Sequence, residues 1–124
     1  MTKQTYVYLL EEPKHGIDVS TAKAFGNIKT LFNSDSRRPS VFKPNEFGAA
    51  VIRELESQGF DPEVDSFLLT GSLVCISVAL GCIMTVWPRV NLLLFSSIEG
   101  RYLCRPFDAL EMTSLKDSVA PSRN

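Results

Sequence analysis

The chain has 124 residues, with 13 lysines and arginines against 14 aspartates and glutamates, so its formal net charge is −1. This length fits one domain, and the lack of a basic excess disfavours general binding to the nucleic-acid backbone. Apolar residues make up 44% of the chain and charged residues 22%, an ordinary globular composition that can fill one sizeable core.

The first half of the chain alternates predicted strands and helices. Thr5–Leu10 is rich in β-forming residues and predicts a first strand. A short helix is expected to end at Phe25, with Asp18 or Ser20 as its N-cap. Asn27–Phe32 predicts a second strand, which a long polar loop follows.

A second helix is predicted to begin at Pro44, which suits the first helical turn. Phe47, Val51 and Leu55 recur every four residues and predict the face that packs on the core. Gly59 is expected to close the helix.

Phe67–Leu69 predicts a third strand that is covered on both faces, because it is apolar without alternation. Leu73–Val86 predicts a third helix. This helix is apolar nearly all round, so we expect it to be buried in the protein or to lie in a dimer interface. Ser77 and Gly81, four residues apart, give it one narrow face that another helix can approach.

Two further strands, Val90–Phe95 and Arg101–Pro106, predict a C-terminal β-hairpin. The pattern predicts an α/β fold: one small domain with a mixed, mostly parallel sheet of about five strands, three helices and this hairpin. We expect the domain to span residues 1–110. Residues 111–124 lose the apolar periodicity and are expected to form a loose C-terminal tail.

The three cysteines indicate a reducing, cytoplasmic protein, because their number is odd and the N-terminal apolar run is too short for a secretory signal. Cys75 and Cys82 are seven residues apart, roughly 10 Å along a helix, which is too far for a disulfide. With one histidine and no Cys-x-x-Cys, neither a metal nor a cofactor is expected.

Ser66–Pro88 contains no charged residue and is long enough to span a bilayer. A turn signature, Thr70-Gly71-Ser72, interrupts it, and a second apolar run follows Arg89 directly. A strand, a turn and a buried helix therefore explain the segment better than a membrane span, which stays open as the alternative.

The polar residues that follow the predicted strands form the candidate site, because ligands of open α/β sheets bind beyond the carboxyl ends of the strands. A turn before the third helix offers backbone N–H groups and the positive end of a helix dipole, and neighbouring arginines add counter-charge. The candidate ligand-binding residues are Thr70, Gly71, Ser72, Arg37, Arg38 and His15.

Enzymatic signatures are mostly missing, and no catalytic residue is assigned. Gly71 lacks the glycines and the lysine of a phosphate loop, and Ser72 lacks the spacing of a nucleophile elbow. The cysteines lie in apolar surroundings, where a thiolate is disfavoured.

Several short segments resemble small α/β proteins of tailed bacteriophages, which mostly have no assigned function. They are Leu9-Leu10, Ala24-Phe25-Gly26-Asn27-Ile28, Leu68-Leu69-Thr70-Gly71-Ser72, Val90-Asn91-Leu92-Leu93-Leu94 and Gly100-Arg101-Tyr102. The resemblance covers about residues 5 to 106 and implies a location in the host cytoplasm. The Thr70-Gly71-Ser72 turn also resembles ligand-binding turns in nucleotide-sensing, Rossmann-like α/β domains.

The first functional hypothesis is a non-enzymatic binding module that holds a small nucleotide-like anion at the strand ends. Both a monomer and a homodimer fit this hypothesis. The second is an interaction module that binds a host protein through its edge strand or its apolar helix. The third is an enzyme that acts on a phosphate-containing ligand with His15 as its base.

Overall fold

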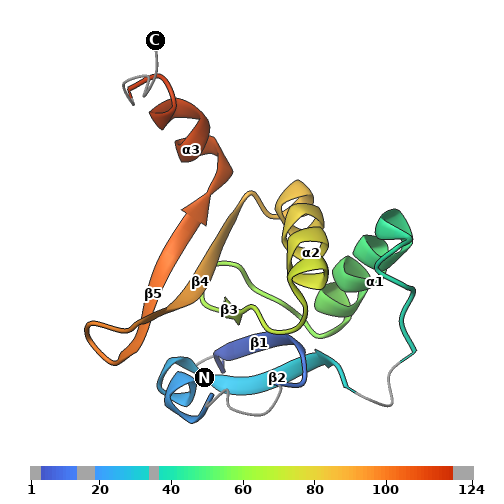
Figure 1. Ribbon diagram of the computed structural model, residues 1–124, viewed down its shortest axis with the longest axis horizontal. Helices are drawn as coiled ribbons and strands as arrows, with labels where there is room; N and C mark the ends of the chain where they lie inside the picture. Colours follow the sequence, from blue (N-terminus) through green and yellow to red (C-terminus); the bar gives the residue numbers. More distant parts are fainter. Residues whose placement is uncertain (1–3, 14–18, 34–36, 119–124) are drawn as a thin grey trace.

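The computed structural model describes residues 4–13, 19–33 and 37–118, and its central feature is a five-stranded sheet (Figure 1). In chain order the elements are β1 (Tyr6–Glu11), the 3-10 helix η1 (Ser20–Phe25), β2 (Asn27–Phe32), α1 (Pro44–Ser57), β3 (Ser66–Leu68), α2 (Leu73–Val86), β4 (Arg89–Ser96), β5 (Arg101–Asp108) and α3 (Ala109–Leu115). The strand order is β2-β1-β3-β4-β5; β1 to β4 run parallel and β5 is antiparallel. The predicted α/β fold, with a mostly parallel sheet and a C-terminal hairpin, is confirmed.

The two central strands, β1 and β3, are covered on both faces of the sheet. Residues 7–10 of β1 are each at most 1% exposed, and all three residues of β3 are buried. A strand that is covered on both faces needs no polar alternation. This is why the unbroken apolar run at Phe67–Leu69 located β3 to within one residue.

Helices α1 and α2 pack side by side on one face of the sheet (Figure 1). Helix α1 buries the predicted stripe of Phe47, Val51 and Leu55. The two helices approach closely at Gly48, where a Cβ atom would collide with Sγ of Cys82. Glycine at this position therefore sets the distance between the two helices.

The opposite face of the sheet is covered in part by η1, whose N-cap differs from the prediction. Val19 precedes the helix without a side-chain cap, and Ser20 is its first residue, while Asp18 lies outside the described residues. The helix ends at the predicted Phe25 and is followed by Gly26, where φ is +150° and a Cβ atom would lie 2.6 Å from the carbonyl oxygen of Thr5. That close approach to β1 requires glycine.

Helix α2 begins and ends at the predicted residues but is only partly covered. Its buried residues are Cys75, Ala79 and Ile83, one stripe that faces the sheet. One chain therefore does not bury the whole apolar circumference of α2, and the other expectation, a dimer interface, stays a prediction. Within the described residues, no helix combines the length and the apolar character needed to cross a membrane.

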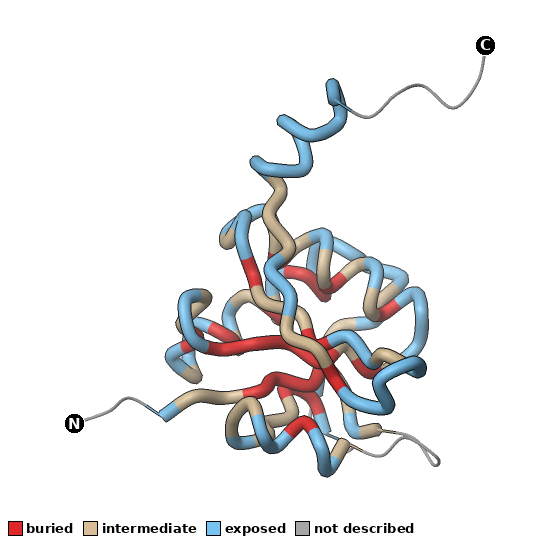
Figure 2. The backbone as a smooth tube through the Cα atoms, turned by 90° about the vertical axis from the view of Figure 1, so that its left-hand side faces the viewer, coloured by how far each residue is buried: buried red, intermediate tan, exposed pale blue. Residues whose placement is uncertain are grey.

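The last element, α3, stands away from the rest of the molecule at the end of β5 (Figures 1 and 2). The sequence predicted no helix here. Asp108 caps it, because its Oδ1 accepts hydrogen bonds from the backbone N–H groups of Leu110 and Glu111 at 2.9 and 3.2 Å. No residue of α3 is buried. The predicted domain boundary at residue 110 stays a prediction.

Candidate functional site

The carboxyl ends of β1 and β3 meet at the point where the strand order changes direction. β1 pairs with β2 on one side and with β3 on the other, so successive connections leave it toward opposite edges of the sheet. Glu11 ends β1, and residues 69–72 connect β3 to α2. This is the crevice in which open α/β sheets usually bind ligands.

Thr70 joins the end of β3 to the end of β1. Its Oγ1 donates to the carbonyl oxygen of Glu11 over 2.6 Å and accepts from the N–H of Glu11 at 3.3 Å. The residue is only 4% exposed. Its hydroxyl therefore continues the strand pairing rather than facing solvent at the site.

The turn into α2 places a carboxylate over the start of the helix. Ser72 is the N-cap, and its Oγ accepts from the N–H of Cys75 at 3.1 Å. Gly71 has φ +115°, and a Cβ atom there would lie 2.5 Å from Oε1 of Glu11. The helix dipole favours negative charge at this position, and the Glu11 side chain supplies it.

Arg38 neutralises this carboxylate. Its Nη2 lies 2.7 Å from Oε2 of Glu11, and both side chains are 27% exposed. Arg38 also donates to the carbonyl oxygen of Pro39 at 3.3 Å, and its guanidinium lies 5.1 Å from the ring centroid of Phe47. The charge that the sequence assigned to a ligand is therefore already paired within the chain.

Cys75 lies beneath this ion pair. Burial raises the pKa of its thiol to about 11; the charge of Glu11 and a hydrogen bond to its carboxylate also raise it, and Arg38 lowers it. The raised pKa disfavours the thiolate, which is the nucleophilic form of cysteine.

The structure thus brings four of the six predicted site residues together and places one apart from them. Arg38, Thr70, Gly71 and Ser72 surround Glu11. Arg37 lies apart from this group, and His15 falls outside the described residues. Glu11 is the group that the sequence prediction did not include, although its place at the end of a predicted strand was visible.

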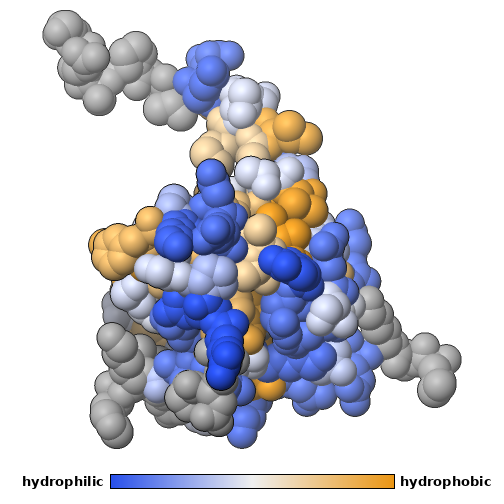
Figure 3. All heavy atoms as spheres, turned by 90° about the vertical axis from the view of Figure 1, so that its right-hand side faces the viewer, coloured by the Kyte–Doolittle hydropathy of each residue, from blue (hydrophilic) through white to orange (hydrophobic). Residues whose placement is uncertain are grey.

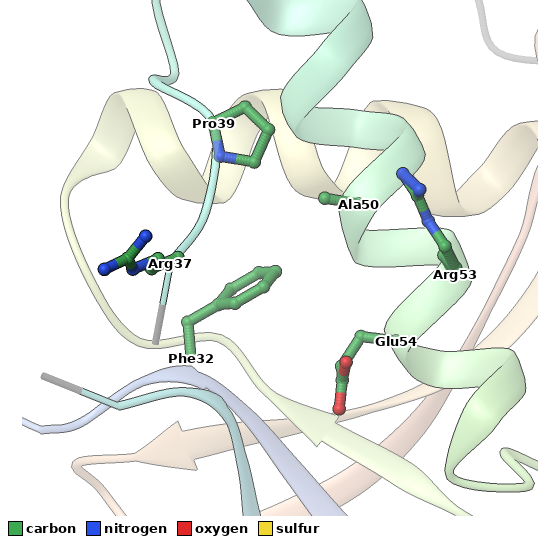
Figure 4. Close-up of a pocket in the computed structure, with 6 residues that line it drawn as sticks. All are labelled: Phe32, Arg37, Pro39, Ala50, Arg53 and Glu54. Atoms are coloured by element: carbon green, nitrogen blue, oxygen red, sulfur yellow. The ribbon is translucent and has the colours of Figure 1, made fainter. Parts of the chain in front are cut away.

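Arg37 lines a separate pocket of about 360 Å³ between the end of β2, the loop after it and α1 (Figure 4). Its other lining residues are Phe32, Pro39, Ala50, Arg53 and Glu54. Figure 4 shows the two arginines on opposite sides of the Phe32 ring, with Arg53 and Glu54 both projecting from α1. Among the described residues, neither arginine forms an ion pair.

Sequence reasoning missed Arg53 and Phe32 as lining residues. Arg53 lies on the exposed side of α1, and nothing in the helical pattern shows that the loop after β2 lies opposite it. The sequence identified Phe32 only as the last residue of a predicted strand. Pairing this strand end with this helix needs the three-dimensional arrangement.

Other buried ionisable groups serve the fold. Asp65 is fully buried, and its carboxylate accepts from the backbone N–H groups of Tyr6 and Asp61, each at 2.9 Å. Burial raises the pKa of Tyr8 to about 12, with the charges of Asp65 and Tyr6 as smaller causes. The described part of the chain holds no group of three or more histidine, cysteine, aspartate or glutamate side chains that could bind a metal ion.

The fold defines a small α/β protein with a mixed sheet and a C-terminal hairpin. The family model described as Phage Pam3 gp32-like protein matches residues 5–109, and the chain belongs to this family. The resemblance to small α/β proteins of bacteriophages is therefore confirmed, over nearly the range that the sequence indicated. Neither the comparison with curated proteins nor the comparison with solved structures gave a match.

Proposed function

We propose that the domain is a non-enzymatic binding module that holds a small, nucleotide-like anion in the pocket of Arg37 and Arg53. The observation that carries the proposal is that two arginines without ion-pair partners among the described residues, Arg37 and Arg53, line one pocket. Arginine is the side chain best suited to bind phosphate or carboxylate through paired hydrogen bonds.

The size and the wall of the pocket support this ligand class. A volume of about 360 Å³ lies within the range of small-molecule sites, roughly 300–1,000 Å³. The Phe32 ring offers an apolar wall to a base, and Glu54 offers a carboxylate to ring N–H groups or to a ribose hydroxyl. The carboxylate of Glu54 is partly engaged, because it accepts from Nε2 of Gln58 at 2.8 Å.

The proposal moves the anion away from the start of α2. Glu11 already lies over Gly71 there and is paired with Arg38. An incoming phosphate would have to displace that carboxylate and separate the ion pair. Binding in the pocket of Arg37 and Arg53 requires neither displacement of Glu11 nor separation of its ion pair. This pocket also includes Arg37, one of the six residues predicted from the sequence.

The strand order supports a Rossmann-like reading of this module. The order β2-β1-β3-β4-β5 is a common doubly wound order whose ligands bind at the strand ends. For a bacteriophage protein, we propose that the module acts in the cytoplasm of the infected host, as a homodimer.

A thermal-shift screen of inorganic phosphate, nucleoside monophosphates and nucleoside triphosphates tests the anion site. We expect at least one to raise the melting temperature, since a ligand that binds only the native state stabilises it. Arg37→Ala combined with Arg53→Ala should abolish the shift. Arg105→Ala, an exposed arginine on β5 whose Nη1 donates to the neighbouring carbonyl oxygen of Cys104, is the matched control.

Two results would reject the anion site. One is a screen in which no anion shifts the native protein. The other is an equal loss of the shift in the Arg105→Ala control, because that would indicate a general charge effect rather than a pocket.

A second candidate function, docking to another protein, is favoured by one observation. Helix α2 and helix α3 both expose large apolar side chains; Leu73 is 79% exposed and Leu110 is 72% exposed. The partner on this surface is either a host protein or a second copy of this chain. The dimerisation test in the next subsection distinguishes these two partners.

A further inference from the structure

An apolar groove of about 390 Å³ runs between α2 and the first turn of α3. Its walls include Ile76, Leu80 and Met84 from α2, Phe107 from β5 and Met112 from α3. Helix α2 has no charged residue along its length. Figure 3 shows hydrophobic surface that continues from α3 onto the body of the molecule, with hydrophilic surface on both sides.

Helix α3 is short, and the described chain covers none of its residues fully. It has seven residues, none of them buried, and Leu110 and Leu115 are 72% and 52% exposed. Isolated helices shorter than about 12 residues are marginal in water even when their composition favours helix. A helix of this length needs an apolar surface to pack against.

The small-residue face of α2 is open. Within the chain, α1 approaches α2 at Gly48 and Cys82, not at Ser77 and Gly81. A Cβ atom at Gly81 would meet nothing within 4 Å. The face that suits close approach of another helix is therefore unused by the chain itself.

We propose that a second copy of this chain covers the groove, with α3 of each copy seated on α2 of the other about a twofold axis. The chain carries both surfaces that such a contact needs. One is the open apolar groove beside α2, and the other is the exposed pair Leu110 and Leu115 on α3. A twofold interface needs such self-complementarity, because each surface meets its own copy. This inference does not depend on the anion pocket.

The exposed apolar area is of the size that a dimer needs. Burying one large apolar side chain removes roughly 100 Å² from water, worth about 25 cal/mol per Å². Leu73, Leu110, Met112 and Leu115 are 47–79% exposed, and with the half-buried groove walls they give on the order of 400 Å² of apolar surface per copy. A standard interface buries about 800 Å² per partner, a little over half of it apolar.

Sedimentation equilibrium of the full chain over a range of concentrations tests the proposal. We expect a reversible dimer in the native chain and a monomer for Leu110→Asp combined with Leu115→Asp. These residues are exposed in the single chain, so the fold should survive. Ile98→Asp, the same change at a 97% exposed residue of the β4–β5 turn, should leave the dimer intact.

Gly81→Leu tests the groove itself. Space is open at Gly81, so the monomer should fold, while the added side chain should fill the groove and abolish dimerisation. A monomeric native chain at every concentration would overturn the proposal, even if a host protein bound α2 and α3. A dimer that survives both the α3 and the Gly81 variants would overturn it as well, since its interface would lie elsewhere.

Discussion

Two regions of the long apolar helix α2, its start and its outer face, differ in how completely the rest of the chain provides them with contacts. At its start, Ser72 caps the helix, and Glu11 lies over Gly71 with Arg38 as its ion-pair partner. Along its outer face, apolar side chains and an open glycine lie exposed beside α3, which has no buried residue. The first region is complete within one chain, and the second is not.

This difference indicates which features are structural and which are left for a partner. The start of α2 carries the residues that sequence reasoning assigns to a ligand, yet their groups bind one another. The outer face carries no motif, yet it exposes apolar area that water disfavours. The surface available for binding is therefore the one whose side chains lack contacts within the chain, and not the one with the most recognisable sequence motif.

The largest effect is expected where the start of α2 is broken sterically. Gly71→Ala places a side chain at φ +115° and against Oε1 of Glu11, so we expect a loss of about 3 kcal/mol of unfolding free energy. Gly59→Ala is the matched control, with φ +75° and open space around it. Chemical denaturation should show a loss of only about 1 kcal/mol there. Equal losses at both glycines would mean that neither the φ of +115° nor the Glu11 side chain restricts residue 71 more than residue 59.

A smaller effect is expected from removal of the carboxylate. Glu11→Ala leaves the partly buried Arg38 guanidinium without its 2.7 Å partner, and we expect a loss of about 1–2 kcal/mol. Glu56→Ala, at an exposed position on α1, should change stability by less than about 0.5 kcal/mol. If the two variants unfold alike in urea, the ion pair is a surface pair of little value and the start of α2 is not self-contained.

The smallest effect concerns Cys75 and appears only at high pH. Its thiol pKa is raised from 9.0 to about 11, so between these values the folded chain keeps a proton that the unfolded chain releases. Stability should therefore be unaffected below about pH 9 and fall as the pH rises toward 11. Melting curves of Cys75→Ala should show a shallower fall over this range than those of the native chain. Identical slopes would show that the thiol is not held neutral by its surroundings.

Sequence reasoning located the elements whose boundaries depend on local chemistry. Pro44 and the stripe of Phe47, Val51 and Leu55 predicted α1, and the bounds of α2 and β2 were predicted to the residue. It missed α3, because the apolar residues at 110, 112 and 115 pack on no core within the chain and so do not follow a regular helical spacing.

The candidate site was predicted only in part, because its key contacts join distant segments. Glu11 and Arg38 are 27 residues apart, and they meet because β1 pairs with β2, whose end lies beside Glu11 and leads into the loop of Arg38. The same holds for Arg37 and Arg53, which line one pocket from a loop and from a helix. Residue types indicated anion chemistry, but the register of the sheet decides which charges neutralise each other.

Hydrogen exchange at the backbone amides of α3, measured at several protein concentrations, tests the central claim most directly. If a second copy covers the outer face of α2, the amides within residues 109–115 should be protected at high concentration and should lose that protection on dilution. Amides of the central strand β1 should stay protected throughout and serve as the internal reference. Protection of α3 that is absent at every concentration, or that does not change with dilution, would contradict the account.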